Sequence, residues 1–363
     1  MTFSKRLIAW QRQHGRHGLP WQQSKDPYRV WLSEIMLQQT QVTAVIPYYL
    51  KFLDAFPTVF ALAKAHQQEV MAHWAGLGYY ARARNLHRCA KAIVGQFNGV
   101  FPSQASALAT LPGIGPSTAA AIAAFSHGER VSILDGNVKR VLARYRAIHG
   151  DPGKKDIERK LWIIASELLP SASTLKNDPH AMASHTQGLM DLGAMICTRG
   201  RPKCESCPVR SSCVAHAQGL TEVLPTPRAR KIIPDRETAM LIIEHDQHLV
   251  LEMRPQKGIW GGLWSLPETH PARTPVMLSD LQTNARHPVS ISRLAGFEHV
   301  FTHFKLHVQP YALKFSGDTR PELSWLNNIE AMRWIPFTQV DGHGLPKPVK
   351  TLLKGWLGRD ATQ

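Results

Sequence analysis

The chain lacks several features that would place it in a membrane or outside the cell. Although 44% of its 363 residues are hydrophobic, it has no apolar run of 18 residues, so no segment is long enough to span a bilayer. The basic N-terminus turns polar after Trp10 and lacks the apolar segment and cleavage site of a secretory signal. With no internal repeat or low-complexity tract, we expect a soluble, cytoplasmic protein with two domains.

Acidic side chains are scarce relative to basic ones. The chain has 27 Asp and Glu against 43 Lys and Arg, a formal net charge of +16. This balance favours a polyanionic partner, because each phosphate that a cation neutralises releases counterions. Charge alone does not separate nucleic acid from an anionic membrane, and generally basic soluble proteins are common.

Cysteine is also scarce, with five in the chain, four of them between positions 197 and 213. This clustering argues against disulfides spread over the fold. The fifth, Cys89, lies beside an apolar stripe of a predicted helix, where we expect a buried, inert thiol.

The segment 111–126 organises the rest of the chain. Gly113 and Gly115 bracket one apolar residue just before an alanine-rich helical run. Glycines there allow a tight turn that points backbone amides outward at a helix start, where they attract phosphate. The pattern resembles a helix-hairpin-helix, a clamp on the DNA backbone that is not sequence-specific. Asp135 follows it, at the start of the next predicted helix.

The chain reads as helices from Asp26 to about residue 213. Apolar residues repeat at helical spacing over 42–53 and 86–97, and these stripes predict core packing. A proline-rich basic stretch at 224–234 then predicts an interdomain linker. Beyond it, alternating apolar residues predict strands over 238–244, 248–253 and 304–315 and a final helix over 349–357. We expect a second, α+β domain.

The four clustered cysteines predict a metal centre. Their spacing is C-x6-C-x2-C-x5-C in a strongly basic loop. A set of four thiolates serves both tetrahedral zinc and iron-sulfur clusters, and the local spacing does not settle which. The proposed ligands are Cys197, Cys204, Cys207 and Cys213.

Two carboxylates stand out. Glu34 is flanked by large apolar groups, which disfavour its charged form and raise its pKa. Asp135 precedes a probable helix at Asn137, where free amides favour the anion. An exposed helical glutamate and an ordinary N-cap aspartate are the simpler interpretations. Such a pair would nevertheless suit glycosidic bond cleavage, which needs an acid for the leaving group and a carboxylate for the sugar cation.

Enzymes that act on a base in duplex DNA must first flip it from the stack. Gln38, Gln39, Leu77 and Tyr79 are candidate wedges, and the Gly76-Leu-Gly-Tyr-Tyr turn offers an aromatic ring for intercalation. Core packing is an equally good interpretation of Tyr79.

Segments over nearly all of the first 215 residues jointly resemble the MutY-type adenine DNA glycosylases, of the endonuclease III superfamily. The resemblance rests on Leu19-Pro-Trp-Gln, Trp31-Leu-Ser-Glu-Ile-Met-Leu-Gln-Gln-Thr-Gln-Val, the segment from Gly76 to Leu86, and Ile133-Leu-Asp-Gly-Asn-Val-Lys-Arg-Val. It continues more weakly beyond. The cysteine loop after Met-Asp-Leu-Gly-Ala-Met-Ile looks like the [4Fe-4S] loop of that superfamily, which favours a [4Fe-4S] cluster over zinc.

The resemblance implies a role for each matching residue. Glu34 would be the acid at adenine N7, and Asp135 would stabilise the sugar cation or its adduct. Adenine would be bound by Trp21, Gln22 and Gln187. The opposing 8-oxoguanine would be probed by Gln38, Gln39, Thr40, Leu77, Gly78 and Tyr79. Further DNA contacts are expected at Gly113, Gly115, Ser117, Asn137 and Lys139.

Ser117 stands where bifunctional relatives carry a Schiff-base lysine. Without that amine the nucleophile should be water, so we expect a monofunctional glycosylase. Lys139, one helical turn beyond Asp135, could give an adventitious adduct.

The second domain resembles a Nudix fold through Gly258-Ile-Trp-Gly-Gly-Leu-Trp-Ser-Leu-Pro. The acidic helix that binds magnesium in Nudix enzymes is missing after Glu268, so nucleotide hydrolysis is not expected. Phe301, Thr302 and His303 resemble a Phe-Ser-His loop that reads 8-oxoguanine. Thr302 keeps the serine hydroxyl but adds a methyl group.

The segment 177–187 departs from the family pattern. His180 and His185 lie near Asp178, but their spacing fits no common metal site. We therefore interpret both histidines as solvated.

The resulting prediction has three parts. Residues 1–216 form a mainly α helix-hairpin-helix glycosylase domain with an iron-sulfur loop at 197–213, residues 217–236 a linker, and residues 237–357 a Nudix-like 8-oxoguanine-recognition domain. The protein would be a nucleoid-associated monomer that binds double-stranded DNA with A·8-oxoguanine or A·G mismatches. The alternatives are an endonuclease III-like glycosylase/lyase for oxidised pyrimidines, a non-catalytic iron-sulfur DNA-binding protein and, more distantly, a Nudix pyrophosphatase.

Overall fold

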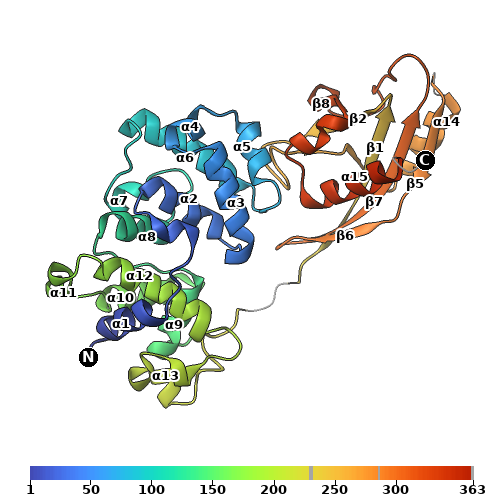
Figure 1. Cartoon of the computed structure of the whole chain (residues 1–363). Helices are drawn as coiled ribbons and strands as arrows, with labels where there is room; N and C mark the ends of the chain where they lie inside the picture. Colours follow the sequence, from blue (N-terminus) through green and yellow to red (C-terminus); the bar gives the residue numbers. More distant parts are fainter. Residues whose placement is uncertain (229–231, 285–286, 361–363) are drawn as a thin grey trace. The chain divides into compact units, whose positions relative to one another are not determined.

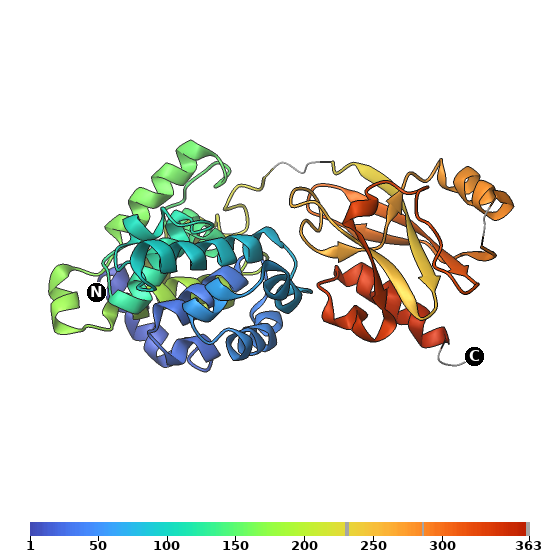
Figure 2. The ribbon, with the colours of Figure 1, turned by 90° about the horizontal axis from the view of Figure 1, so that it is seen from above.

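A computed structural model describes residues 1–228, 232–284 and 287–360 (Figure 1). The chain forms two compact units, one from Met1–Lys64 with Asn85–Arg230 and the other from Ala65–Arg84 with Lys231–Gln363. The boundaries at 216 and 237 stay predictions, and residues 229–231 of the expected linker lie outside the described residues. Figure 2 shows the helical unit and the sheet-containing unit from above.

The first unit is helical, as expected. Its α-helices are α1 (Phe3–His14), α2 (Pro27–Leu37), α3 (Val42–Ala55), α4 (Val59–Lys64), α6 (Ala81–Phe97), α7 (Ala105–Leu108), α8 (Pro116–His127), α9 (Gly136–Tyr145), α10 (Lys155–Glu167), α11 (Ala172–Asn177), α12 (Ala181–Asp191) and α13 (Val214–Ala217). Short turns are η1 (Pro20–Gln23), the π-turn η2 (Leu192–Ile196), η3 (Cys204–Ser206) and η4 (Arg210–Ser212).

The predicted apolar stripes lie on α3 and α6. Tyr49 and Phe52 of α3 are buried, as are Leu86 and Ile93 of α6, and burial of such side chains stabilises a fold by about 1.5–3 kcal/mol each. Leu50, expected in the α3 stripe, is instead 53% exposed, because the buried face of α3 is narrower than its apolar pattern. Cys89 is buried as predicted, and burial raises the pKa of its thiol to about 12.

Helix α8 lies at the centre of the helical unit. Ala119–Ala124 are all buried, and their small side chains allow neighbouring helices to approach closely. Helix α2 packs on α8, and α12 packs against α1, α8 and α9. The helix starts at Pro116, and its C-cap Gly128 has the left-handed conformation (φ 69°), which glycine adopts without strain. This packing brings α2 and α12, each with predicted site residues, onto α8, and α9 onto α12.

The second unit contains α5 (Gln67–Trp74) and a mixed sheet with two helices. The remaining elements are β1 (Asp235–His245), β2 (His248–Met253), β3 (Trp264–Ser265), β4 (Glu268–Thr269), α14 (Thr274–Asn284), β5 (Val289–Arg293), β6 (Phe297–Val300), β7 (Lys305–Phe315), η5 (Ile329–Ala331), β8 (Met332–Pro336), η6 (Phe337–Gly342) and α15 (Lys347–Asp360). The predicted strands and final helix are confirmed as β1, β2, β7 and α15.

The long strands β1 and β7 form the parallel centre of the sheet, with Thr238 opposite Val308. The other recorded pairings are antiparallel. The sheet order is β3-β2-β1-β7-β5, with β4 on β1, β6 on β7 and β8 on β2. In the described part of the chain, no helix combines the length and the apolar character needed to cross a membrane.

Candidate active site

The first unit contains a pocket of about 410 Å³, within the range of small-molecule sites. It lies among the end of α1, the following loop with η1, helix α2 and helix α12. Its lining includes Trp21, Gln22, Ser33, Glu34, Leu37, Phe125, Gln187 and Met190. Residues distant in the sequence that were predicted to bind adenine therefore share one cavity with the proposed acid. Asp135 is not among the lining residues.

The η1 turn places Trp21 and Gln22 at this pocket. Trp21 is buried and packs edge-on against Tyr49, with ring centroids 5.4 Å apart. Gln22 Oε1 accepts a hydrogen bond from Leu19 N (3.1 Å), and its Nε2 donates to Arg16 O (2.8 Å). Both ends of the Gln22 amide thus hold the loop, which leaves its side chain as a wall of the pocket.

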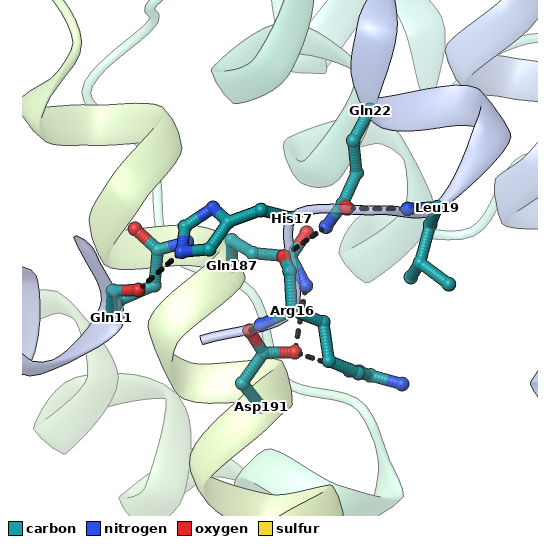
Figure 3. A network of polar contacts seen from close by, with 7 residues as sticks. All are labelled: Gln11, Arg16, His17, Leu19, Gln22, Gln187 and Asp191. Atoms are coloured by element: carbon teal, nitrogen blue, oxygen red, sulfur yellow. Dashed lines mark hydrogen bonds and ion pairs between the residues drawn. The ribbon is translucent and has the colours of Figure 1, made fainter. Parts of the chain in front are cut away.

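A polar network behind the pocket joins the loop after α1 to helix α12 (Figure 3). Asp191 Oδ1 accepts hydrogen bonds from Arg16 Nε (2.7 Å) and Gln187 Nε2 (2.8 Å), and its Oδ2 accepts one from Arg16 N (2.9 Å). The Asp191 side chain is 0% exposed. His17 Nε2 lies 3.0 Å from Gln11 O. Arg16 and Asp191 were not among the predicted site residues, although Asp191 stands in the Met-Asp-Leu-Gly segment before the cysteine loop.

Glu34 lies on α2 between buried neighbours. Ser33 and Ile35 on either side are buried, whereas Glu34 itself is partly accessible through the pocket that it lines. Desolvation, followed by repulsion from Asp135, raises the pKa of Glu34 to about 8. The carboxyl therefore holds a proton at neutral pH, as expected of a general acid.

Asp135 caps helix α9. Its Oδ1 accepts a hydrogen bond from Val138 N at 2.7 Å, so the predicted N-cap geometry is present. The expectation that helix amides favour its anion describes only part of the balance. Desolvation raises the pKa of Asp135. The backbone amides of Val138 and Asn137 and the charges of Arg140 and Lys139 lower this pKa, but by less, so the net shift is upward. Glu34 has no comparable stabilisation of its anion, so the two sites remain chemically distinct.

The hairpin before α8 forms the tight glycine turn that the sequence predicts. Gly113 has φ 79°, and Gly115 is the N-cap of α8. Both are exposed, and a Cβ atom on Gly115 would meet nothing within 4 Å. Ser117, in the first turn, faces inward: its Oγ accepts a hydrogen bond from Leu134 N at 3.0 Å.

Helix α9 also carries the next predicted DNA-contact residues. Lys139 Nζ forms a 2.7 Å ion pair with Glu158 Oε1 on α10. Asn137 Oδ1 accepts a hydrogen bond from Arg140 Nη2 (2.9 Å). The Arg140 guanidinium also donates to the carbonyls of Cys197 (2.8 Å) and Gly193 (2.6 Å). These contacts attach α9 to the start of the cysteine loop.

The α2 C-terminus presents three further predicted residues. Gln38 Nε2 donates to Thr118 Oγ1 on α8 (3.2 Å). Gln39 is exposed and has a positive φ of 57°, a conformation that non-glycine residues seldom adopt. Thr40 Oγ1 donates to Gln38 O (3.4 Å). The turn therefore projects Gln39 outward.

The glycine turn before α6 belongs to the second unit. Gly76, Gly78 and Tyr79 have positive φ angles. Tyr79 is 43% exposed whereas Leu77 is 7% exposed, so the candidate wedge at the surface is Tyr79 and not Leu77. The Arg82 guanidinium lies 5.4 Å from the Tyr79 ring centroid and donates to Gly78 O (3.1 Å).

The four predicted ligands Cys197, Cys204, Cys207 and Cys213 line one small cavity, together with the buried Arg144. Arg144 Nη1 lies 3.4 Å from Cys197 Sγ. Within the described residues, no three His, Cys, Asp or Glu side chains are grouped as ligands of a single metal ion. Four thiols around one cavity fit a donor set for a cluster of iron and sulfide.

The predicted lesion-reading loop connects β6 and β7. Phe301 stacks on buried Phe304 with ring centroids 4.6 Å apart, and Phe301 N donates to Phe304 O at 2.8 Å. Thr302 and His303 are exposed at the tip, and Thr302 Oγ1 lies 3.4 Å from His303 Nδ1. The stacked rings of Phe301 and Phe304 thus support a loop tip from which Thr302 and His303 point outward.

One expectation for α12 was wrong. His180 is exposed, but His185 is 1% exposed and lies near the Phe3 ring, and neither of its ring nitrogens has a hydrogen-bond partner among the described residues. Burial lowers the pKa of His185 to about 4. His185 lies on the inward face of α12. Its neighbours in the sequence are polar, so the local pattern predicted an exposed position.

Comparisons with known proteins agree with this architecture. Residues 32–167 match the HhH-GPD superfamily of base excision DNA repair proteins, and residues 238–355 match the NUDIX domain. The chain is similar to a solved thermostable thymine-DNA glycosylase, with a TM-score of 0.52 and 27% sequence identity. The matched region covers 60% of this chain and 95% of the solved one.

Curated relatives match over nearly the full length. Adenine DNA glycosylase of Buchnera aphidicola subsp. Acyrthosiphon pisum (strain APS) is 36% identical over 98% of this chain and 97% of its own. The Rattus norvegicus and Homo sapiens enzymes of the same name are 34% and 32% identical, over 93% and 91% of this chain and 75% and 71% of their own. The chain thus belongs to the adenine DNA glycosylase family, within the HhH-GPD superfamily of base excision repair proteins.

Proposed function

We propose that the protein hydrolyses the N-glycosidic bond of adenine mispaired with 8-oxoguanine, and also with guanine, in double-stranded DNA. The observation that carries the proposal is Glu34: a carboxyl with a pKa of about 8 that lines the pocket of about 410 Å³ and interacts with a second carboxyl, Asp135. The family membership supplies the substrate class. DNA as substrate in turn favours the nucleoid as its place of action.

Glu34 would donate its proton to adenine N7 as the bond between N9 and C1′ breaks. The bonding electrons leave with the base, and the Asp135 carboxylate stabilises the positive charge on the sugar. Water then adds to C1′, and its proton returns to the Glu34 carboxylate. Adenine and an abasic site are the products.

We propose a monofunctional enzyme because no lysine occupies position 117. The Ser117 hydroxyl is used by Leu134 N, and Lys139 is paired with Glu158. A hydrolytic route leaves the DNA strand intact, in contrast to the glycosylase/lyase alternative.

Cys197, Cys204, Cys207 and Cys213 would hold a [4Fe-4S] cluster. Bound there, the cluster would supply a rigid, positively lined loop for DNA, with redox chemistry not required for hydrolysis. Arg140 and Arg144 attach this loop to α9, the helix that Asp135 caps.

The test is single-turnover base release from duplexes with adenine opposite 8-oxoguanine, guanine or thymine. We expect release opposite 8-oxoguanine and guanine, and strand cleavage only after alkaline heating. Release of oxidised pyrimidines with direct strand cleavage would instead support the endonuclease III-like alternative. Binding of DNA without any base release would support the non-catalytic one.

A further inference from the structure

The buried Asp191 governs how Gln187 can be oriented. A carboxylate accepts hydrogen bonds and cannot donate them. Asp191 Oδ1 lies 2.8 Å from the Gln187 side-chain nitrogen, so the contact requires the nitrogen, and not the oxygen, of the amide to face Asp191. The opposite orientation would place the Gln187 oxygen against the fully buried Asp191 carboxylate, which is costly.

The Asp191 carboxylate is itself held in place. Arg16 binds it through its side-chain Nε and its backbone N–H. Gly15 makes this approach possible, because a Cβ atom there would lie 2.9 Å from Asp191 Oδ2. The network in Figure 3 therefore fixes Asp191 from the loop after α1 and leaves Gln187 a single favourable orientation.

The other end of the amide remains for a ligand. Gln187 lines the pocket, and among the described residues its Oε1 accepts no recorded hydrogen bond. One Nε2 hydrogen is used by Asp191, and the end of the amide turned away from Asp191 is the Oε1 acceptor. An acceptor pairs with the 6-amino group of adenine and repels the 6-carbonyl oxygen of guanine or hypoxanthine.

We propose that Asp191 is a positioning residue for base specificity: it orients the Gln187 amide so that its oxygen accepts a hydrogen bond from a 6-aminopurine. This assignment rests on the proposed function. It adds a buried residue that touches no substrate but decides which purine the pocket accepts. Gln22 plays no such part, since both ends of its amide are bound to backbone groups.

The test compares single-turnover release of adenine and hypoxanthine, each opposite 8-oxoguanine. Asp191→Asn supplies an amide nitrogen that can donate to Gln187 Oε1, so the Gln187 amide can reverse. We expect the adenine-to-hypoxanthine rate ratio to fall about tenfold or more, the effect of one misplaced hydrogen bond. Asp178→Asn is the matched control, because Asp178 pairs with Arg12 (2.5 Å) and does not contact Gln187. Its ratio should stay at the wild-type value.

A double-mutant cycle separates positioning from a general loss of structure. Gln187→Met should lower the same ratio, and Asp191→Asn should then have no further effect on it. An unchanged ratio in folded Asp191→Asn would overturn the proposal. If that variant does not fold, an unchanged ratio in Gln187→Met would overturn it as well. Failure of the wild type to release adenine would instead contradict the proposed function.

Discussion

Ser117 Oγ accepts a hydrogen bond from the backbone N–H of Leu134 at 3.0 Å, and Leu134 directly precedes Asp135. Leu134 is buried, so this hydroxyl is the partner of an amide that water does not reach. The first turn of α8 thereby positions the carboxylate that caps α9. Ser117 therefore has a structural use of its own.

Ser117→Ala should destabilise the protein and slow base release. Loss of the hydroxyl leaves Leu134 N unpaired, at a cost of about 1–3 kcal/mol, and loosens the backbone before Asp135. We expect a Tm several degrees lower and a rate of base release about tenfold lower. Ser126→Ala on the same helix is the control, because the buried Ser126 hydroxyl has no hydrogen-bond partner in the described part of the chain. Equal effects of the two substitutions would contradict the role of Ser117.

The rate of adenine release should fall as pH rises through about 8. Above that pH Glu34 loses the proton that it must donate, and the logarithm of the rate should then decrease by about one for each pH unit. The measurement is the single-turnover rate from pH 5 to 9.5, with DNA binding followed over the same range. A rate that stays constant to pH 9.5 while binding is retained would exclude Glu34 as the acid.

The same titration affects stability. The folded state holds the Glu34 proton up to about pH 8, whereas the unfolded chain releases it near the ordinary value of 4.5. The folded state therefore binds more protons in this window, and stability falls as pH rises from 4.5 through 8. The Glu34→Gln side chain does not titrate. We therefore expect the free energy of unfolding of this variant to exceed that of the wild type by roughly a few kcal/mol at pH 8, and to be nearly equal to it below pH 4.5. Equal thermal unfolding at both pH values would contradict the raised pKa.

Release of Lys139 from its ion pair should increase covalent trapping. The wild type should give little borohydride-trapped adduct, because Glu158 binds Lys139. Glu158→Gln removes the negative partner, so we expect more adduct, and Lys139→Ala in the same background should abolish the increase. Adduct that persists without Lys139 and accompanies rapid strand cleavage would show a lyase and contradict the monofunctional assignment.

The exposed tip of the β6–β7 loop should set preference for the lesion. His303→Ala or Thr302→Ala should lower the ratio of adenine release opposite 8-oxoguanine to release opposite guanine, by about tenfold for one lost hydrogen bond. His307→Ala, an exposed histidine on β7 paired with Asp235, is the control and should keep the ratio. Unchanged ratios in all three variants would place lesion recognition elsewhere.

Local sequence patterns predicted the elements of this protein well. The helical stripes, the glycine hairpin, the N-cap at Asp135 and the long strands all depend on spacing and on residues near one another, which a sequence displays directly. The proximity of Glu34 to Gln187 was expected only through a resemblance, because no short-range pattern links α2 with α12.

The remaining features depend on tertiary packing. Asp191 and Arg16 are common charged residues whose importance appears only when the loop after α1 lies on α12. The burial of His185 and the exposure of Leu50 were predicted wrongly, because the width of a buried helix face is decided by its neighbours. The raised pKa of Asp135 likewise reflects desolvation by surrounding elements, which outweighs the favourable local cap.

The proposed reaction depends on two carboxyls, the protonated Glu34 and Asp135, to cleave the bond between adenine and its sugar. Its most direct test is single-turnover adenine release from an A·8-oxoguanine duplex by the wild type, Glu34→Gln and Asp135→Asn, at matched folding and DNA binding. We predict release by the wild type and a rate at least a hundredfold lower in each variant, the usual range of general acid and electrostatic contributions. Release by either variant at the wild-type rate would contradict the two-carboxyl mechanism.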